Sequence, residues 1–170
     1  VPVPNDIDSP VLLRPDNFTP LTRTPWAGSK IAKSIKNEYV SDKDLKIGEV
    51  WDFSCAKEFP SMLLRRDMSL EQLIELDPIR VLGPISGQMG SCEILVKIID
   101  TGADLSVQVH PDDSDPHLKG NECGKPESWL IIDAEPNAGI YLGFAKPCSL
   151  SELRQKLEDG SGGEILQFLP

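Results

Sequence analysis

Short strands joined by short links dominate the middle of this chain and constrain its fold more than any other feature. Four segments are rich in β-branched residues or alternate apolar with polar ones, which is the pattern of strands. They span residues 92–100, 104–110, 127–134 and 138–144. A turn at Thr101 and Gly102 separates the first two, and residues 135–137 separate the last two. Links this short join antiparallel strands, because a parallel pair needs a crossover of about a dozen residues or more.

The segments before this region predict one more strand and one helix. Residues 47–54 (IGEVWDFS) have the pattern of a strand that is contacted on both faces. Residues 68–78 (MSLEQLIELDP) predict a short helix, because Leu and Ile fall on one stripe. Ser69 and Gln72 have the spacing of a capping box at its start, and Pro78 ends it.

The remaining segments complete a mainly β pattern. Residues 82–90 (LGPISGQMG) predict a loop, and residues 149–159 predict a helix that Ser149 caps. Residues 162–170 favour another short helical turn. Since many short strands alternate with few helices and no repeat is present, we expect a β-sandwich or barrel with helical additions.

The length of 170 residues predicts one domain with its own core. Four prolines among the first 15 residues indicate an extended arm without helix or strand period. We therefore expect an arm over residues 1–13 and a single domain over residues 14–170.

Charge and cysteine content exclude several classes of protein. A net charge of -10 repels nucleic acid and anionic membrane surfaces. No apolar run approaches the roughly 20 residues that span a bilayer, and the first residues lack a signal-peptide pattern. The cysteines are widely spaced without a C-x-x-C pair, which favours reduced thiols in a cytoplasmic protein. They are Cys55, Cys92, Cys123 and Cys148.

A polar stripe on the segment SVQVH raises the question of a site. Side chains two apart on a strand share a face, so Ser106, Gln108 and His110 lie on one face, opposite two valines. The simplest interpretation is a face exposed to solvent. If the sheet closed into a barrel, the stripe would instead line an interior site.

A second polar pair follows on the next predicted strand. Lys125 and Glu127 are two residues apart, so they also share a face. An amide, an imidazole and a carboxylate from Gln108, His110 and Glu127 form a nitrogen and oxygen set that suits zinc with positions left open for substrate. A fourth ligand is missing from this set.

Long stretches of the sequence resemble a known family. The text LSVQVHPDD, followed by GKPESWLIIDAEPNAGIYLGF, is similar to the signature region of the type I phosphomannose isomerases, zinc enzymes of the cupin superfamily. NFTPLTRTPWAGSKI and IGEVWDFS resemble earlier parts of that family, so the resemblance covers residues 14–146. It implies a cupin-like β-barrel of the jelly-roll type with a few short helices, of which this chain would hold a part.

The resemblance implies roles for individual residues. Gln108, His110 and Glu127 match the zinc ligands of the family, and Lys125 matches a catalytic lysine. The substrate-binding residues that match are Lys97 and Ser106. A sheet position near the same cavity is matched by Glu49 and Trp51.

The implied reaction interconverts mannose 6-phosphate and fructose 6-phosphate through an enediol. The zinc ion would stabilise the oxygen charge that develops when a proton leaves the carbon beside the carbonyl. The two lysines, Lys97 and Lys125, could bind phosphate, stabilise the oxyanion or transfer a proton. Their residue types do not choose among these roles.

The sequence also departs from the family. Family members supply a last histidine ligand and a catalytic arginine from a segment downstream of Pro170, and the other histidine here, His117, lies in a polar loop that we expect at the surface. Two hypotheses follow: the metal-bearing portion of an isomerase, or a non-catalytic module that binds metal or sugar phosphate. A barrel ending at Pro170 would leave unpaired edges, so we expect a partner chain, a homo-oligomer or further strands.

Overall fold

The computed structural model describes residues 10–88, 90, 92–120 and 122–170. The chain divides between Leu105 and Ser106 into two compact units. Within the described residues, no helix is both long enough and apolar enough to cross a bilayer. The predicted arm over residues 1–13 lies largely outside the described part of the chain. One domain over residues 14–170 stays a prediction, because two compact units can belong to a single domain.

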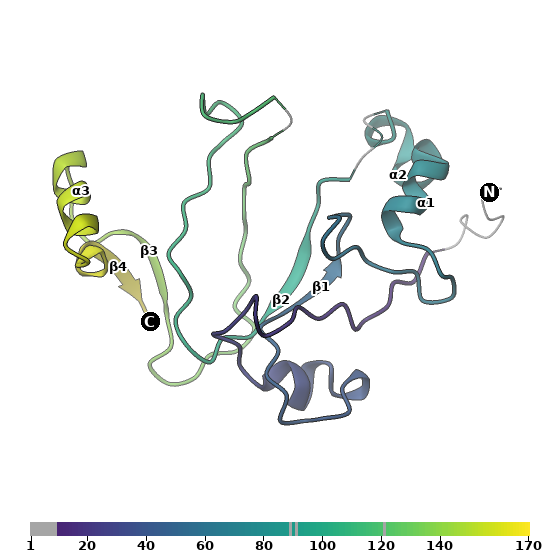
Figure 1. Cartoon of the computed structure of the whole chain (residues 1–170), viewed down its shortest axis with the longest axis horizontal. Helices are drawn as coiled ribbons and strands as arrows, with labels where there is room; N and C mark the ends of the chain where they lie inside the picture. Colours follow the sequence, from purple (N-terminus) through teal and green to yellow (C-terminus); the bar gives the residue numbers. More distant parts are fainter. Residues whose placement is uncertain (1–9, 89, 91, 121) are drawn as a thin grey trace. The chain divides into compact units, whose positions relative to one another are not determined.

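A two-stranded antiparallel sheet organises the first unit (Figure 1). Strand β1 (Glu49–Phe53) pairs with β2 (Val96–Ile99), and this register sets Trp51 opposite Lys97. On its other edge, β1 is bridged by Phe18, and Trp51 N–H donates to a carbonyl of the same N-terminal segment. β1 is therefore covered along both edges, which is why three of its five residues are buried.

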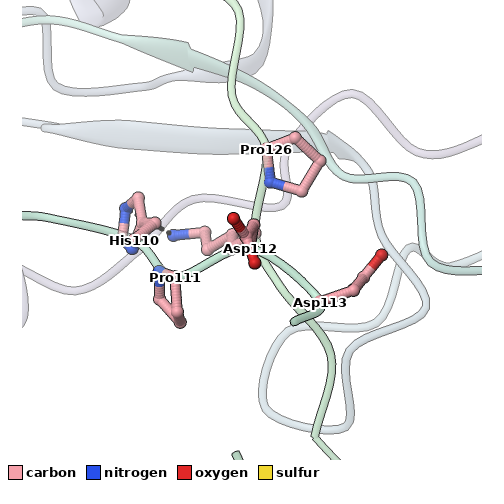
Figure 2. Close-up of a pocket in the computed structure, with 6 residues that line it drawn as sticks. His110, Pro111, Asp112, Asp113 and Pro126 are labelled. Atoms are coloured by element: carbon pink, nitrogen blue, oxygen red, sulfur yellow. Dashed lines mark hydrogen bonds between the residues drawn. The ribbon is translucent and has the colours of Figure 1, made fainter. Parts of the chain in front are cut away.

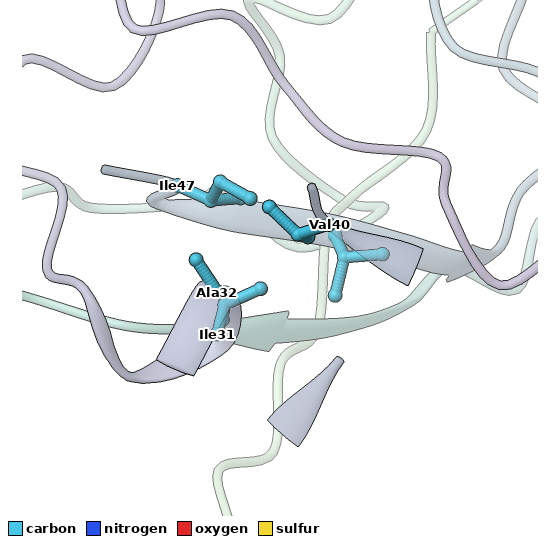
Figure 3. Close-up of a cluster of buried hydrophobic side chains, with 5 residues drawn as sticks. Ile31, Ala32, Val40 and Ile47 are labelled. Atoms are coloured by element: carbon cyan, nitrogen blue, oxygen red, sulfur yellow. The ribbon is translucent and has the colours of Figure 1, made fainter. Parts of the chain in front are cut away.

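One apolar cluster lies beside β1 (Figure 3). Residues before and within the sheet build it together with the short helical segment η2 (Ile31–Ile35) and with Val40, which follows the 3₁₀ turn η3 (Asn37–Tyr39). Its buried members are Ile31, Ala32, Val40, Ile47 and Val50, with Phe18 and Ile98 packed against them. Burial of such side chains stabilises the unit by about 1.5–3 kcal/mol each relative to exposure.

A second apolar cluster of the first unit forms around helix α1 (Leu70–Leu76). The helix begins at the predicted capping box: Gln72 N–H donates to Ser69 Oγ at 3.1 Å, and Ser69 N–H donates to Gln72 Oε1 at 2.9 Å. The buried members of the cluster are Leu63, Leu70, Leu73 and Ile74. The last three form the stripe predicted from sequence, which therefore faces inward.

Helix α2 (Pro78–Ser86) follows directly and corrects part of the sequence prediction. The Asp77 carboxylate accepts a bond from the first turn, so Pro78 ends α1 and begins the next helix. The predicted loop over residues 82–90 is wrong at its start, since helical residues continue to Ser86. Gly83 breaks the helix with a φ of 82°, and a proline then restarts it. Gly and Pro here mark a kink and not a loop.

The second unit holds its own two-stranded antiparallel sheet (Figure 1). Strand β3 (Ile140–Phe144) pairs with β4 (Leu166–Leu169). Between them lie α3 (Leu150–Glu158) and the 3₁₀ turn η4 (Gly162–Ile165). The Ser149 side chain caps α3 as predicted. The helical turn predicted over residues 162–170 is confirmed at its start, whereas its second half forms β4.

The predicted strand pairings are wrong although several strands are confirmed. The pattern at residues 47–54 and 138–144 forms β1 and β3, and part of residues 92–100 forms β2. The short links favoured residues 104–110 as the partner of β2 and residues 127–134 as the partner of β3, but these two strands pair with β1 and β4. The described residues therefore combine short helices with two separate two-stranded sheets, and they form neither a helical bundle nor a closed barrel.

Two predicted strands do not form ladders. Residues 104–110 and 127–134 are irregular, and they carry exposed apolar side chains, such as Val109 at 92% and Leu130 at 85% exposure. Alternation and β-branching favour an extended backbone, but a strand needs a second backbone to bond with. The prediction of these two strands is wrong because the sequence pattern of a segment does not show which other segment its backbone can pair with.

Two leucines of contrasting burial test this description of the core. Leu73→Ala should lower the free energy of unfolding by about 2–5 kcal/mol, because Leu73 is 0% exposed and its removal leaves a cavity. Leu130→Ala should change it by less than about 0.5 kcal/mol, since that side chain is 85% exposed. Urea unfolding of both variants checks the contrast, and equal losses would contradict it.

The described thiols are free, and two of them contact each other beside the second cluster. Burial, together with the neighbouring Cys92, raises the pKa of the Cys55 thiol to about 11. Since the thiolate is the reactive form, roughly one Cys55 thiol in a thousand is reactive at pH 8.

Alkylation should therefore separate Cys55 from the exposed Cys123. At pH 8 iodoacetamide should modify Cys123 first, and the Cys55 rate should rise about tenfold per pH unit up to its pKa. Mass spectrometry of the peptides measures both rates. Rapid modification of Cys55 at pH 8 in the folded chain would be inconsistent with the raised pKa.

Candidate functional site

Two loops of the second unit bring the predicted site residues together. Lys125 N–H donates to the Pro111 carbonyl at 3.0 Å, and Gly124 N–H donates to Asp113 Oδ1 at 2.8 Å. A Cβ on Gly124 would lie 2.6 Å from backbone atoms of Asp112 and Asp113, so only glycine permits this approach. This close approach explains why glycine stands at position 124.

His110, Lys125 and Glu127 meet at one point. His110 Nε2 lies 3.4 Å from Glu127 Oε1, and Lys125 Nζ lies 3.0 Å from that same oxygen. Lys125 Nζ is also 3.4 Å from His110 Nε2. An imidazole nitrogen and a carboxylate oxygen therefore converge on one cation, which in this structure is the ammonium of Lys125.

The spacing of the two ligand atoms fits the predicted zinc site. Tetrahedral zinc holds nitrogen and oxygen ligands at about 2.1 Å, which puts two ligand atoms about 3.4 Å apart. The distance from His110 Nε2 to Glu127 Oε1 is 3.4 Å. The two spacings agree, and in this structure both atoms contact the Lys125 ammonium.

The third predicted ligand is placed differently. Gln108 Nε2 donates a 3.1 Å hydrogen bond to Ser106 Oγ, so these two members of the predicted stripe contact each other. Gln108 Oε1, the atom that we expect to bind the metal, takes no part in that hydrogen bond. Among the described residues, no group of three or more His, Cys, Asp or Glu side chains is arranged to hold a metal. The convergence seen here involves two of the three predicted ligands.

The electrostatics at Glu127 favour its charged form. Partial burial works to raise the pKa of the carboxyl, but hydrogen bonds from Lys125 and Trp129, with the charges of Lys125 and His110, bring its pKa below the usual value. Trp129 Nε1 donates to Glu127 Oε2 at 3.4 Å. A ligand that is already a carboxylate does not have to lose a proton to bind a cation.

A hollow of about 310 Å³ lies at this point (Figure 2). Its lining is the loop pair just described: His110, Pro111, Asp112, Asp113, Lys125 and Pro126. Asp112 accepts bonds from Ser114 N–H and Oγ, which lower the pKa of Asp112. His117 contacts Asp115 at 2.9 Å, and its side chain is 92% exposed, as predicted for a surface residue.

The predicted substrate residue Lys97 belongs to the first unit. Its Nζ lies 3.0 Å from Glu49 Oε1 and 5.6 Å from the centre of the Trp51 ring. Sequence reasoning placed Glu49 and Trp51 near a cavity but did not pair them with Lys97. It also missed Arg23, whose guanidinium lies 5.2 Å from the Trp51 ring. The i, i+2 spacing of Glu49 and Trp51 was the available signal for a shared face.

Removing the Lys125 charge should raise the pKa of Glu127. Lys125→Met deletes both the hydrogen bond and the nearby positive charge that lower this pKa. An NMR titration of the Glu127 side-chain carboxyl measures the change. Lys146→Met serves as control, because Lys146 is exposed and is not among the groups that shift Glu127. An unchanged Glu127 pKa in Lys125→Met would contradict the contact.

Comparison with known proteins identifies the family of the matched region. Residues 20–140 match the model of the phosphomannose isomerase type I catalytic domain. A probable mannose-6-phosphate isomerase of Bacillus subtilis (strain 168), GmuF, is 31% identical over 145 residues, covering 84% of this chain and 44% of that protein. No solved structure matches this chain.

Two further relatives also match most of this chain and less than half of their own length. Mannose-6-phosphate isomerase ManA of Bacillus subtilis is 32% identical over 126 residues, covering 72% of this chain and 39% of that protein. Mannose-6-phosphate isomerase of Streptococcus mutans is 28% identical over 148 residues, covering 85% and 45%. The chain thus spans less than half the length of these relatives.

Proposed function

Because this chain belongs to the type I phosphomannose isomerase family, we propose that it is the metal-bearing portion of an enzyme that interconverts mannose 6-phosphate and fructose 6-phosphate. The observation that carries the proposal is the convergence of His110 and Glu127 inside the region that matches the family model. The relatives bear the name mannose-6-phosphate isomerase over a longer chain, so the activity proposed is that of the whole protein.

The proposed zinc ligands are Gln108, His110 and Glu127. Two of them present a nitrogen and an oxygen 3.4 Å apart, and the low pKa of Glu127 supplies negative charge. When bound, zinc supplies a Lewis acid that stabilises negative charge on the sugar oxygens. A neutral amide at Gln108 leaves more net positive charge at the site than a second carboxylate would.

Lys125 is the proposed catalytic residue. An aldose becomes a ketose when a proton leaves the carbon beside the carbonyl, passing through an enediol whose oxygens carry charge. Lys125 Nζ carries a positive charge and three N–H donors, of which one is directed at Glu127 Oε1, 3.0 Å away. In the proposed mechanism, Lys125 donates a hydrogen bond to the substrate oxygen on which negative charge develops.

The proposed substrate-binding residues are Ser106 and Lys97. Ser106 Oγ accepts a bond from Gln108, and its own O–H remains a donor for a sugar or phosphate oxygen. Lys97 supplies an ammonium that suits an anionic substrate. Its assignment rests on the family resemblance and on the partial exposure of its side chain, 23%.

The proposed architecture is a cupin-like β-barrel of the jelly-roll type. Residues 104–110 and 127–134 have strand patterns and exposed apolar side chains, so partner strands would pair their backbones and cover their surfaces. Further strands of a longer protein or a second copy of the chain would serve. The widely spaced cysteines support a cytoplasmic enzyme of carbohydrate metabolism.

One observation favours the alternative of a non-catalytic module that binds metal or sugar phosphate. The sequence holds two histidines, and His117 is too exposed to complete the ligand set around His110. A module that uses only the residues of this chain would bind metal or sugar phosphate without turnover.

Metal content, measured on this chain, and isomerisation, measured on the whole protein that the proposal describes, separate the two functions. The isomerase should bind about one zinc per chain and convert mannose 6-phosphate to fructose 6-phosphate, and a chelator should abolish conversion. His110→Ala and Glu127→Gln should each reduce zinc binding at least tenfold, because the first removes a ligand atom and the second removes the negative charge of a ligand. His117→Ala is the matched control, since its side chain is 92% exposed, and it should bind zinc normally.

The outcomes decide between the two functions. Zinc binding by this chain without conversion by the whole protein would support the non-catalytic module. Zinc binding that is equal in His110→Ala and in His117→Ala would contradict the proposed ligands, whatever the activity.

A further inference from the structure

A buried carboxylate of the first unit holds the Lys97 ammonium. Glu49 is 7% exposed, and each of its oxygens has a partner. Oε1 lies 3.0 Å from Lys97 Nζ, and Oε2 accepts a 2.8 Å hydrogen bond from Trp51 Nε1. Because both oxygens are engaged, the carboxylate has one orientation, and the charge that it presents to Lys97 is fixed in place.

The sheet register explains why these three side chains meet. Trp51 on β1 stands opposite Lys97 on β2, and Glu49 precedes Trp51 by two residues, so all three share one face. Lys97 reaches diagonally across the pair to Glu49, a distance that a long side chain spans easily. The contact therefore follows from the backbone ladder and does not depend on a loop.

The ammonium is restrained but still available to a ligand. The bond to Glu49 uses one of its three donors. The Trp51 ring, with its centre 5.6 Å from Nζ, restrains the side chain from a second direction. With 23% of the Lys97 side chain exposed, the remaining donors can meet an oxygen from solution.

A second ion pair on the same ring offers an internal comparison. Arg23 also lies over Trp51, at 5.2 Å, and its guanidinium pairs with Glu58 at 2.5 Å. Its side chain is 42% exposed and that of Glu58 is 64% exposed, so water competes for both charges. The Lys97 pair is mostly buried and has a second contact to the Trp51 indole N–H through Glu49, whereas both members of the Arg23 pair are exposed.

We propose that Glu49 is a positioning residue for substrate binding, which holds the Lys97 ammonium in the orientation that meets the anionic group of the sugar phosphate. This inference rests on the proposed function, in which Lys97 binds substrate. Glu49 acts through Lys97, and the Trp51 indole fixes Glu49. A restrained cation loses less rotational freedom on binding an anion than a free lysine does, and this difference favours affinity.

Glu49→Gln in the 170-residue chain tests the proposal, because it keeps the side-chain shape and removes the charge. Calorimetry should show about tenfold weaker binding of mannose 6-phosphate, while binding of unphosphorylated mannose is unchanged. Where the chain isomerises, KM should rise by the same factor and kcat should change less than about twofold, because the contact is equal in ground and transition states. Glu58→Gln, the matched control, should alter neither.

A double-mutant cycle separates positioning from a general structural role. Lys97→Met should weaken binding of mannose 6-phosphate at least as much as Glu49→Gln does. In Lys97→Met, the further change Glu49→Gln should add less than about twofold, because the group that Glu49 positions is gone. Additive losses would show that Glu49 acts independently of Lys97 and would overturn the proposal.

A second variant keeps the test decisive if Glu49→Gln fails to fold. Trp51→Phe retains an aromatic ring near Lys97 but removes the N–H that fixes Glu49 Oε2. It should weaken mannose 6-phosphate binding about threefold with the same selectivity over mannose. Unchanged binding in this variant would overturn the proposal.

Failure of the proposed function gives a different result from failure of this inference. Phosphate-selective binding that depends on Glu49, without isomerisation, supports the inference and not the enzyme. Isomerisation whose KM is indifferent to Glu49→Gln supports the enzyme and overturns the inference. Absence of mannose 6-phosphate binding by the unmodified chain also overturns it.

Discussion

The buried backbone and carboxylate of Asp100 tie the first unit together. Asp100 N–H donates to the Gly48 carbonyl at 2.9 Å, and its own carbonyl accepts from Gly28 N–H at 2.9 Å. Its carboxylate, in a residue that is 8% exposed, accepts the N–H groups of Lys30 and Ile31 at 2.5 and 3.1 Å. One residue at the end of β2 thus anchors both β1 and the start of η2.

The position of Lys97 depends on this anchor. A Cβ on Gly28 would lie 2.3 Å from Asp100 Oδ1. Glycine at this position therefore allows the backbone to approach the carboxylate closely. With the end of β2 held, the register opposite β1 is set, and Lys97 stands across from Trp51. The ion pair with Glu49 is a consequence of that register, because the pairing of the two strands determines which side chains lie next to each other.

In the second unit, two side chains share the ammonium of one lysine. The imidazole of His110 and the carboxylate of Glu127 both contact the Lys125 ammonium. Within this unit, Lys125 is therefore the positive charge that the imidazole and the carboxylate share.

The sequence by itself determined the local structure: the capping box of Ser69 and Gln72, the Ser149 cap and the strands that became β1 and β3. These depend on neighbours within a few residues, and so did the shared face of Lys125 and Glu127. Only the tertiary structure decided the strand partners, the Lys97 bond to Glu49 and the contact of His110 with Glu127. Pairing between distant segments depends on which backbones can reach each other, and alternation along a single segment contains no information about its partner.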